Sequence, residues 1–85
     1  STVPTQALTL MNNGFVLNQA ELFADRIERQ APGDIERQID LAYRIALTRS
    51  PTDAETAVAK SLVGEQSLVD LTHVILNLNE FLYLR

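Results

Sequence analysis

The sequence contains no cysteine and no tryptophan, and only three glycines, three prolines, two tyrosines and three phenylalanines in 85 positions. Without cysteine, these residues can form neither a disulfide, nor a thiolate metal site, nor a covalent link to haem. The absence leaves the compartment open, because a domain with a sufficient core needs no disulfide. The lack of tryptophan also disfavours a stacking platform for sugar rings.

Long hydrophobic runs and basic clusters are missing as well. No window approaches the roughly 18 uncharged apolar residues of a membrane span, and the chain does not open on a basic and then apolar signal segment. The seven Lys and Arg residues are scattered, and the formal net charge is −4. Nucleic-acid binding would need a clustered basic stripe. We therefore expect no membrane span and no nucleic-acid surface.

What is present is typical of a globular chain. The hydrophobic fraction is 46% and the charged fraction 21%, and the length suits one small domain. The chain begins with STVPTQAL and has no initiator Met. We expect residues 1–85 to form a single helical domain that was excised from a longer protein.

Apolar residues recur at three- and four-residue steps in four segments that turn signals separate. The predicted helices are Phe15–Ala31, Ile35 to about Thr48, Asp53 to about Val63, and a last helix capped by Ser67. A short helix is also predicted for Val3–Asn12, before the turn Asn12-Asn13-Gly14. Since no segment alternates with period two, the predicted fold is all-α, a small bundle of four main helices plus a short N-terminal helix.

The buried face of each helix follows from its apolar stripe. The predicted buried residues are Val16, Ala20, Phe23, Ile27 and Ala31; Ile35, Ile39, Ala42, Ile45 and Ala46, with Tyr43 at the edge; Ala54, Val58 and Leu62; and Leu68, Leu71, Ile75 and Leu78. The last helix is apolar over the widest arc, which predicts that it lies at the centre. Asp34 and the capping box of Thr52 and Glu55 are predicted to cap the helices that follow them.

The closing stretch ILNLNEFLYLR is unusually apolar for the end of a sequence. We expect the helix to break over Asn77–Asn79, with Asn79-Glu80 as a turn, after which Phe81–Leu84 continue the buried surface. In that interpretation, Phe81→Ala lowers stability by about 3–5 kcal/mol. The alternative is that NEFLYL forms a strand that pairs with a partner.

Ser67, Asp70 and His73 have the residue types of a hydrolytic triad. On one helix, however, they step around the surface side by side, and no Gly-rich elbow accompanies them. A helix cap followed by a polar face is the better interpretation. His73 is the sole histidine, and the sequence has no HExxH or similar ligand spacing. We therefore predict no catalytic, cofactor or metal residue in this segment.

Two groups of residues are candidates for interaction. The polar residues that we expect in connections could contribute to a composite site, although a structural role is favoured for them: Asn12, Asn13, Asn77, Asn79 and Glu80. Such a site requires the Asn12–Asn13 turn and the Asn77–Glu80 end to line one pocket. Leu17, Leu22 and Leu47 fall outside the main stripes. They are either ordinary exposed leucines, or residues that contact the next helix, or a docking or homo-oligomer surface.

Three stretches together resemble a domain of unknown function found in planctomycetes and related bacteria. They are VPTQALTLMNNGFV (Val3–Val16), YRIALTRSPTDAE (Tyr43–Glu55) and HVILNLNEFLYLR (His73–Arg85), and they occur in the family's order. Gly14 and Ser50 stand where that family commonly has proline, and Thr48 where it often has glycine.

This resemblance implies that the segment is the C-terminal part of a long, exported or cell-envelope protein. Such proteins often carry a planctomycete cytochrome-type module with a CxxCH haem motif upstream, so any haem would belong to the parent protein and not to these residues. Our leading interpretation is a non-catalytic structural or interaction module that packs on upstream domains of its own chain. The alternative is a contribution of polar residues to a composite active or ligand site of a parent enzyme.

Overall fold

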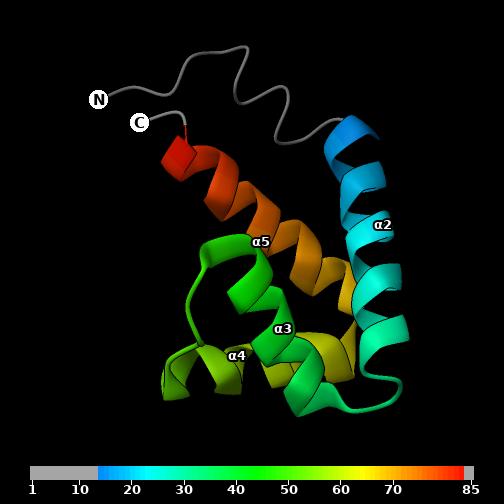
Figure 1. Cartoon of the computed structure of the whole chain (residues 1–85), viewed down its shortest axis with the longest axis vertical. Coiled ribbons are helices and arrows are strands. Elements are labelled where there is room, and N and C mark those ends of the chain that lie inside the picture. The colour runs from blue at the N-terminus through cyan, green and yellow to red at the C-terminus, as the bar shows by residue number, and fades with distance from the viewer. Residues whose placement is uncertain (1–13, 84–85) are drawn as a thin grey trace.

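A computed structural model describes the backbone of residues 14–83 and the side chains of residues 14–78. It contains four helices, α2 (Gly14–Gln30), α3 (Ile35–Leu47), α4 (Asp53–Glu65) and α5 (Leu68–Tyr83), and the described part of the chain has no strand (Figure 1). The prediction of an all-α fold with four main helices is thus confirmed. The short helix predicted for Val3–Asn12 lies outside the described residues. Gly14, which was predicted in a turn, is the first residue of α2.

Small residues on the buried face of α2 bring α5 close to it. Val16, Ala20, Ala24 and Ile27 are buried, and Ala31 is buried just beyond the helix end. At the contact, the Thr72 hydroxyl oxygen lies 2.7 Å from the carbonyl oxygen of Ala20 and 3.0 Å from that of Val69. The hydroxyl of Thr72 on α5 can therefore donate to the backbone of α2. This contact requires the two helices to lie close together.

The turn between α2 and α3 is fixed by backbone conformation and by two polar side chains. Gly33 adopts a left-handed conformation, with φ of 70°, which favours glycine because a Cβ atom is strained there. The Asp34 side chain caps α3 by accepting from the backbone N–H of Arg37 at 3.2 Å. Gln38 is buried, and its Nε2 donates to the Ala31 carbonyl at 2.8 Å and to the Glu28 carboxylate. The side-chain amide of Gln38 therefore finds both of its acceptors at the end of α2 and just beyond it.

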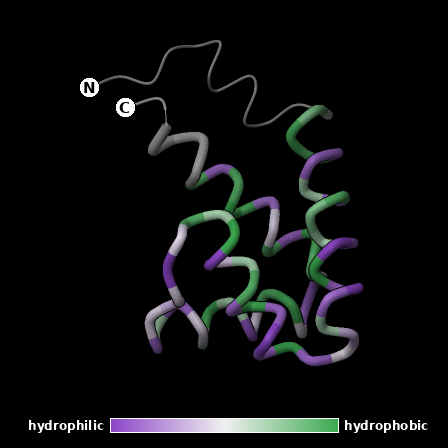
Figure 2. The backbone as a smooth tube through the Cα atoms, viewed as in Figure 1, coloured by the Kyte–Doolittle hydropathy of each residue, from purple (hydrophilic) through white to green (hydrophobic). Residues whose placement is uncertain are grey.

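Helix α5 lies at the centre of the bundle, as predicted: it contacts α2, α3 and α4, and its contact with α2 is the most extensive between any two of the described helices. In Figure 1 it runs obliquely from the lower end of α2 past α3. Leu71 and Ile75 are its most buried apolar residues, and they join a core that includes Ile27, Ile39 and Ala59. Figure 2 shows that both apolar and polar segments occur along the coloured parts of the helices.

The predicted break in the last helix is wrong. Helix α5 continues without interruption through Asn77, Asn79 and Glu80 to Tyr83, so Asn79-Glu80 is not a turn. Asparagine lowers helix propensity by no more than about 0.7 kcal/mol per residue. The helix is anchored by buried Ile75 and half-buried Leu76, and this packing outweighs the weak local preference. The predicted strand over NEFLYL is also wrong for the residues up to Tyr83.

The predicted buried stripe of α4 is wrong by about one residue. Ala59 is buried, whereas Val58 is 69% exposed and Ala54 is exposed. Leu62 is half-buried and packs against the core. Because apolar residues surround much of α4, its sequence gives no strong preference for one face, and contacts with α3 and α5 decide which face is buried.

Three further residues differ from their predicted burial. Ile35, the first residue of α3, is 42% exposed, and Leu78 on α5 is 48% exposed. Tyr43 is buried more deeply than its predicted edge position suggests, with 6% of its surface exposed. Burial at helix ends and edges depends on the neighbouring helices, which a single-helix pattern does not contain.

Candidate functional site

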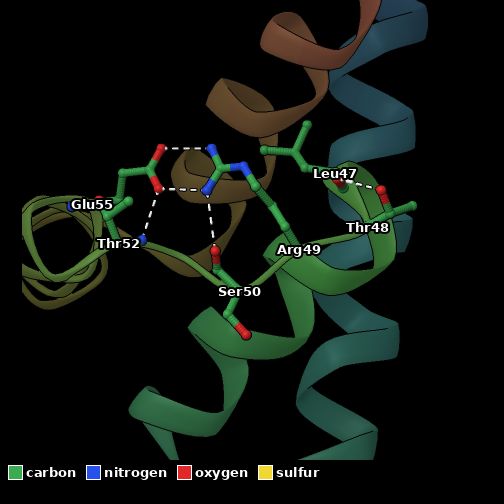
Figure 3. Close-up of polar contacts among 6 residues, drawn as sticks. All are labelled: Leu47, Thr48, Arg49, Ser50, Thr52 and Glu55. Carbon is green, nitrogen blue, oxygen red and sulfur yellow. Dashed lines mark hydrogen bonds and ion pairs between the residues drawn. The ribbon is translucent and has the colours of Figure 1, made fainter.

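The most extensive polar cluster joins α3 to α4 (Figure 3). The Arg49 guanidinium donates to both carboxylate oxygens of Glu55, at 2.7 and 2.8 Å, and to the Ser50 carbonyl at 3.1 Å. The backbone N–H of Thr52 donates to Glu55 Oε1 at 2.9 Å, and the N–H of Glu55 donates to Thr52 Oγ1 at 3.1 Å. The predicted capping box is therefore confirmed, and Arg49 closes it from the other side.

These contacts change the acidity of Glu55. The hydrogen bond from Arg49, followed by the one from the Thr52 backbone, lowers the pKa of Glu55 to about 2. The Arg49 guanidinium also lies 5.6 Å from the centre of the Tyr43 ring, and burial raises the pKa of Tyr43. The charges of this cluster pair with one another, so the cluster holds the connection between the two helices in place.

On α5, two of the three triad-type residues form a helix cap. The Ser67 hydroxyl accepts from the Asp70 backbone N–H at 3.2 Å and donates to Asp70 Oδ2 at 2.8 Å. His73 takes no part in this pair. Nε2 of His73 and Oδ1 of Asn77 are buried, and neither atom has a hydrogen-bond partner among the described residues. Residues four apart share one face of a helix, so both unsatisfied atoms belong to the same side of α5.

A groove runs between α2, α3 and α5. Its larger part has a volume of about 320 Å³ and is lined by Gln19, Phe23, Arg26, Ile45, Ala46 and Leu76. A second part, of about 250 Å³, shares Gln19 and Leu76 and adds Phe15 and Val16. We call both parts together the α2–α5 groove. Its walls are mainly apolar, with the side chains of Gln19 and Arg26 as the polar members of the lining.

The predicted site residues are only partly covered by the structure. Asn77 lies on α5 and is half-buried. Asn79 and Glu80 belong to the same helix, but their side chains lie outside the described part, as do Asn12 and Asn13 entirely. A pocket formed jointly by these residues therefore stays a prediction, as does the effect of Phe81→Ala.

The off-stripe leucines divide into two kinds. Leu17 and Leu22 on α2 are 43% and 58% exposed, whereas Leu47 is half-buried and packs against the core. The α2–α5 groove was not predicted, because its lining comes from three helices. Leu22 lines neither part of the groove, and exposed Leu22 four residues before Arg26 on one helix face is the nearest signal that the sequence contains.

The described residues meet the requirements of neither a metal site nor a membrane-spanning helix. No group of three or more His, Asp or Glu side chains among residues 14–78 is arranged to hold a metal ion. Within the described helices, none is both long enough and apolar enough to cross a membrane.

Comparison with known proteins places the chain in a family. No curated protein and no solved structure matches it. The family model described as "PSD1: Protein of unknown function (DUF1553)" matches residues 1–63, which include α2, α3 and most of α4. The two motifs Val3–Val16 and Tyr43–Glu55 lie within the matched residues, and His73–Arg85 lies beyond them. With almost three quarters of its length matched, the chain belongs to the PSD1 (DUF1553) family of proteins of unknown function.

Proposed function

We propose that this domain is a non-catalytic helical module that packs against other domains of a longer bacterial protein. The observation that carries the proposal is the large apolar surface left on a small bundle. The large apolar side chains that remain more than two-fifths exposed are Phe15, Leu17, Leu22, Ile35, Val58, Val74 and Leu78. Extended exposed apolar surface is typical of a contact with another protein.

The exposed apolar residues are concentrated on the two longest helices. Phe15 and Leu22 lie on one side of α2, two helical turns apart, and Val74 and Leu78 lie four residues apart on α5. Transferring one such side chain from full exposure to full burial stabilises a contact by about 1.5–3 kcal/mol. Several partly exposed residues together can therefore support a stable contact between domains.

The best-formed polar clusters support a structural role. The Arg49–Glu55 pair holds the connection of α3 to α4, Gln38 holds the α2–α3 turn, and Ser67 caps α5. Each of these groups is engaged in fixing a helix end.

The wider context is part of the proposal. From its resemblance to planctomycete-type proteins, we infer that the domain is the C-terminal part of an exported or envelope protein. Any haem would be held by a cytochrome-type module upstream, and the partner surface would belong to upstream domains of the same chain.

Hydrogen–deuterium exchange tests the proposal. The backbone amides of α2 and α5 should exchange more slowly in the full-length protein than in the isolated domain, because a docked surface opens less often. The amides of α4, on the side of exposed Val58, provide an internal comparison. Equal exchange of all four helices in both proteins would contradict the proposal.

A composite ligand site is the second candidate, and the unsatisfied atoms of His73 and Asn77 favour it. Buried polar atoms nearly always have a hydrogen-bond partner, so a ligand or another domain could supply one to His73 Nε2 and Asn77 Oδ1. The predicted contributors Asn12, Asn13, Asn79 and Glu80 would complete such a site in the parent enzyme.

Substitution of Asn77 tests the composite site. If its carbonyl oxygen awaits an external donor, Asn77→Leu removes a buried unsatisfied acceptor and stabilises the isolated domain by about 1–3 kcal/mol. The melting temperature should rise accordingly. A lower melting temperature would mean that Asn77 serves the fold, which argues against the composite site.

A further inference from the structure

One basic residue of the described chain is unpaired and lines an apolar groove. Among the described Lys and Arg residues, Arg29, Arg44, Arg49 and Lys60 each form an ion pair with a carboxylate. Arg26 and Arg37 form no ion pair with any described residue. Of these two, only Arg26 lines the α2–α5 groove. An unpaired guanidinium next to apolar walls is the feature that we seek to explain.

The position of Arg26 on α2 makes it part of a continuous exposed stripe. Phe15, Gln19, Leu22 and Arg26 follow one another at four-, three- and four-residue steps, so they share one side of the helix. Gln19 and Arg26 line the groove, and Leu22 lies between them in the stripe and is 58% exposed. The stripe therefore offers an apolar surface with a positive charge at one end.

The remaining walls of the groove are apolar and come from three different helices. Phe23 on α2, Ile45 and Ala46 on α3, and Leu76 on α5 surround the larger part. Its volume of about 320 Å³ is at the lower limit for small-molecule sites, which span roughly 300–1,000 Å³. A space of this size can hold one or two apolar side chains of a docked protein segment.

We propose that the α2–α5 groove binds an amphipathic helix whose apolar side chains enter the groove and whose Asp or Glu pairs with Arg26. This inference rests on the proposed function and names the chemistry of the partner surface. A guanidinium binds a carboxylate through two parallel hydrogen bonds, which gives geometric specificity as well as attraction. The described bundle has no strand edge to which an extended segment could add, so a helix laid in a groove is the recognition mode that fits.

The charge of the chain makes this contact selective. The formal net charge is −4, and most of the described cations are already paired with a carboxylate. Arg29, the nearest other cation along α2, is already paired with Asp25. Within the groove, Arg26 is therefore the cation that can pair with an acid of the partner helix, and charge complementarity of this kind fixes orientation and partner choice.

A display library of helical peptides tests the proposal on the 85-residue domain. We expect the enriched peptides to share an Asp or Glu three or four positions from a Leu, Ile or Phe. The affinity of the best peptide, measured by fluorescence anisotropy, should fall about tenfold or more for Arg26→Glu. Selection on the Arg26→Glu variant should enrich Lys or Arg in place of the acid.

Arg37→Glu is the matched control, because Arg37 is also an exposed and unpaired cation but does not line the groove. The affinity of the Arg37→Glu variant for the peptide should stay within about twofold of that of the unsubstituted domain. Failure to enrich any peptide, enrichment of peptides without an acid, or equal effects of the two substitutions would each overturn the proposal. Self-association of the domain that Arg26→Glu abolishes, seen by sedimentation, would also overturn it, since a second copy would then occupy the groove.

The outcome is separable from that of the proposed function. If exchange is slowed in the full-length protein only around Val74 and Leu78, the domain docks through another face. The interaction module would then stand while the groove proposal would fail. If no helix is protected in the full-length protein, the proposed function itself is contradicted.

Discussion

At the scale of single residues, Thr48 at the α3 C-terminus is the one non-glycine residue with a positive φ in the described part of the chain. Thr48 adopts φ of 57° and ψ of 28°, and its N–H donates to the Arg44 carbonyl. This left-handed conformation ends many helices, but a β-branched residue is strained in it by roughly 1–2 kcal/mol relative to glycine. Thr48 is exposed, so its side chain packs against little.

We predict that Thr48→Gly stabilises the domain. Relief of backbone strain outweighs the greater flexibility of glycine in the unfolded chain, for a net gain of about 0.5–1 kcal/mol. The melting temperature should rise by a few degrees, as measured by circular dichroism. Thr48→Val is the control, because it retains the branched Cβ; a rise of equal size in that variant would disprove the explanation by strain.

A second prediction at this scale concerns acid stability. The pKa of Glu55 is lowered from its ordinary value of 4.5 to about 2 in the folded protein. A depressed pKa means that the unfolded state binds a proton first, so the stabilisation is complete above pH 4.5 and is lost as the pH falls toward 2. Denaturant unfolding at several pH values should therefore show stability decreasing through this window.

The Glu55→Gln variant should show a weaker pH dependence between pH 4.5 and 2 and lower stability at neutral pH, because Arg49 then loses its charged partner. Glu21→Gln is the control, since the Glu21 side chain is exposed and forms no hydrogen bond or ion pair with a described residue. An unchanged pH profile in Glu55→Gln would show that the ion pair contributes no stability.

At the scale of helices, the contact of α2 with α5 depends on small side chains. Ala20 is fully buried, and its carbonyl faces the Thr72 hydroxyl. We predict that Ala20→Leu separates the two helices and lowers stability by about 1–3 kcal/mol. Asn18→Leu adds the same side chain to an exposed position of α2, and it should change the denaturation midpoint little. Equal effects of the two substitutions would show that the helices can adjust to a larger residue.

Helix boundaries were predictable because their signals are local. Asp34, Thr52 and Ser67 each cap the helix that follows, and such caps involve residues only three apart in sequence. The uninterrupted course of α5 through Asn77 and the burial of Ala59 on α4 were not predictable. Both depend on packing against other helices, which overrides weak propensity and a weak apolar stripe.

The candidate sites show the same division. Ser67 and Asp70 were correctly interpreted as a cap, because one helix determines their relation. The α2–α5 groove requires the relative positions of three helices, and the burial of Asn77 Oδ1 requires its surroundings. A single-sequence pattern contains neither, although exposed Leu22 near Arg26 is compatible with the groove.

At the scale of the whole molecule, the sequence separation of contacting residues predicts the folding rate. The turns from α2 to α3 and from α4 to α5 are short, which favours rapid folding. The contact between Ala20 and Thr72, however, joins residues 52 positions apart. We predict a single relaxation of about 10 μs to 10 ms, measurable by temperature jump or stopped flow. A dominant phase of seconds would contradict this expectation.

The central position of α5 has a consequence for synthesis in the cell. Proteins emerge from the ribosome from N- to C-terminus, at about 5–20 residues per second, so α2, α3 and α4 appear before the helix that contacts all of them. Until Leu71 and Ile75 arrive, the apolar faces around Ile27 and Ile39 lack their main partner. The nascent chain thus passes through a stage in which its future interior is open to chaperones, and the bundle closes only when its last helix is released.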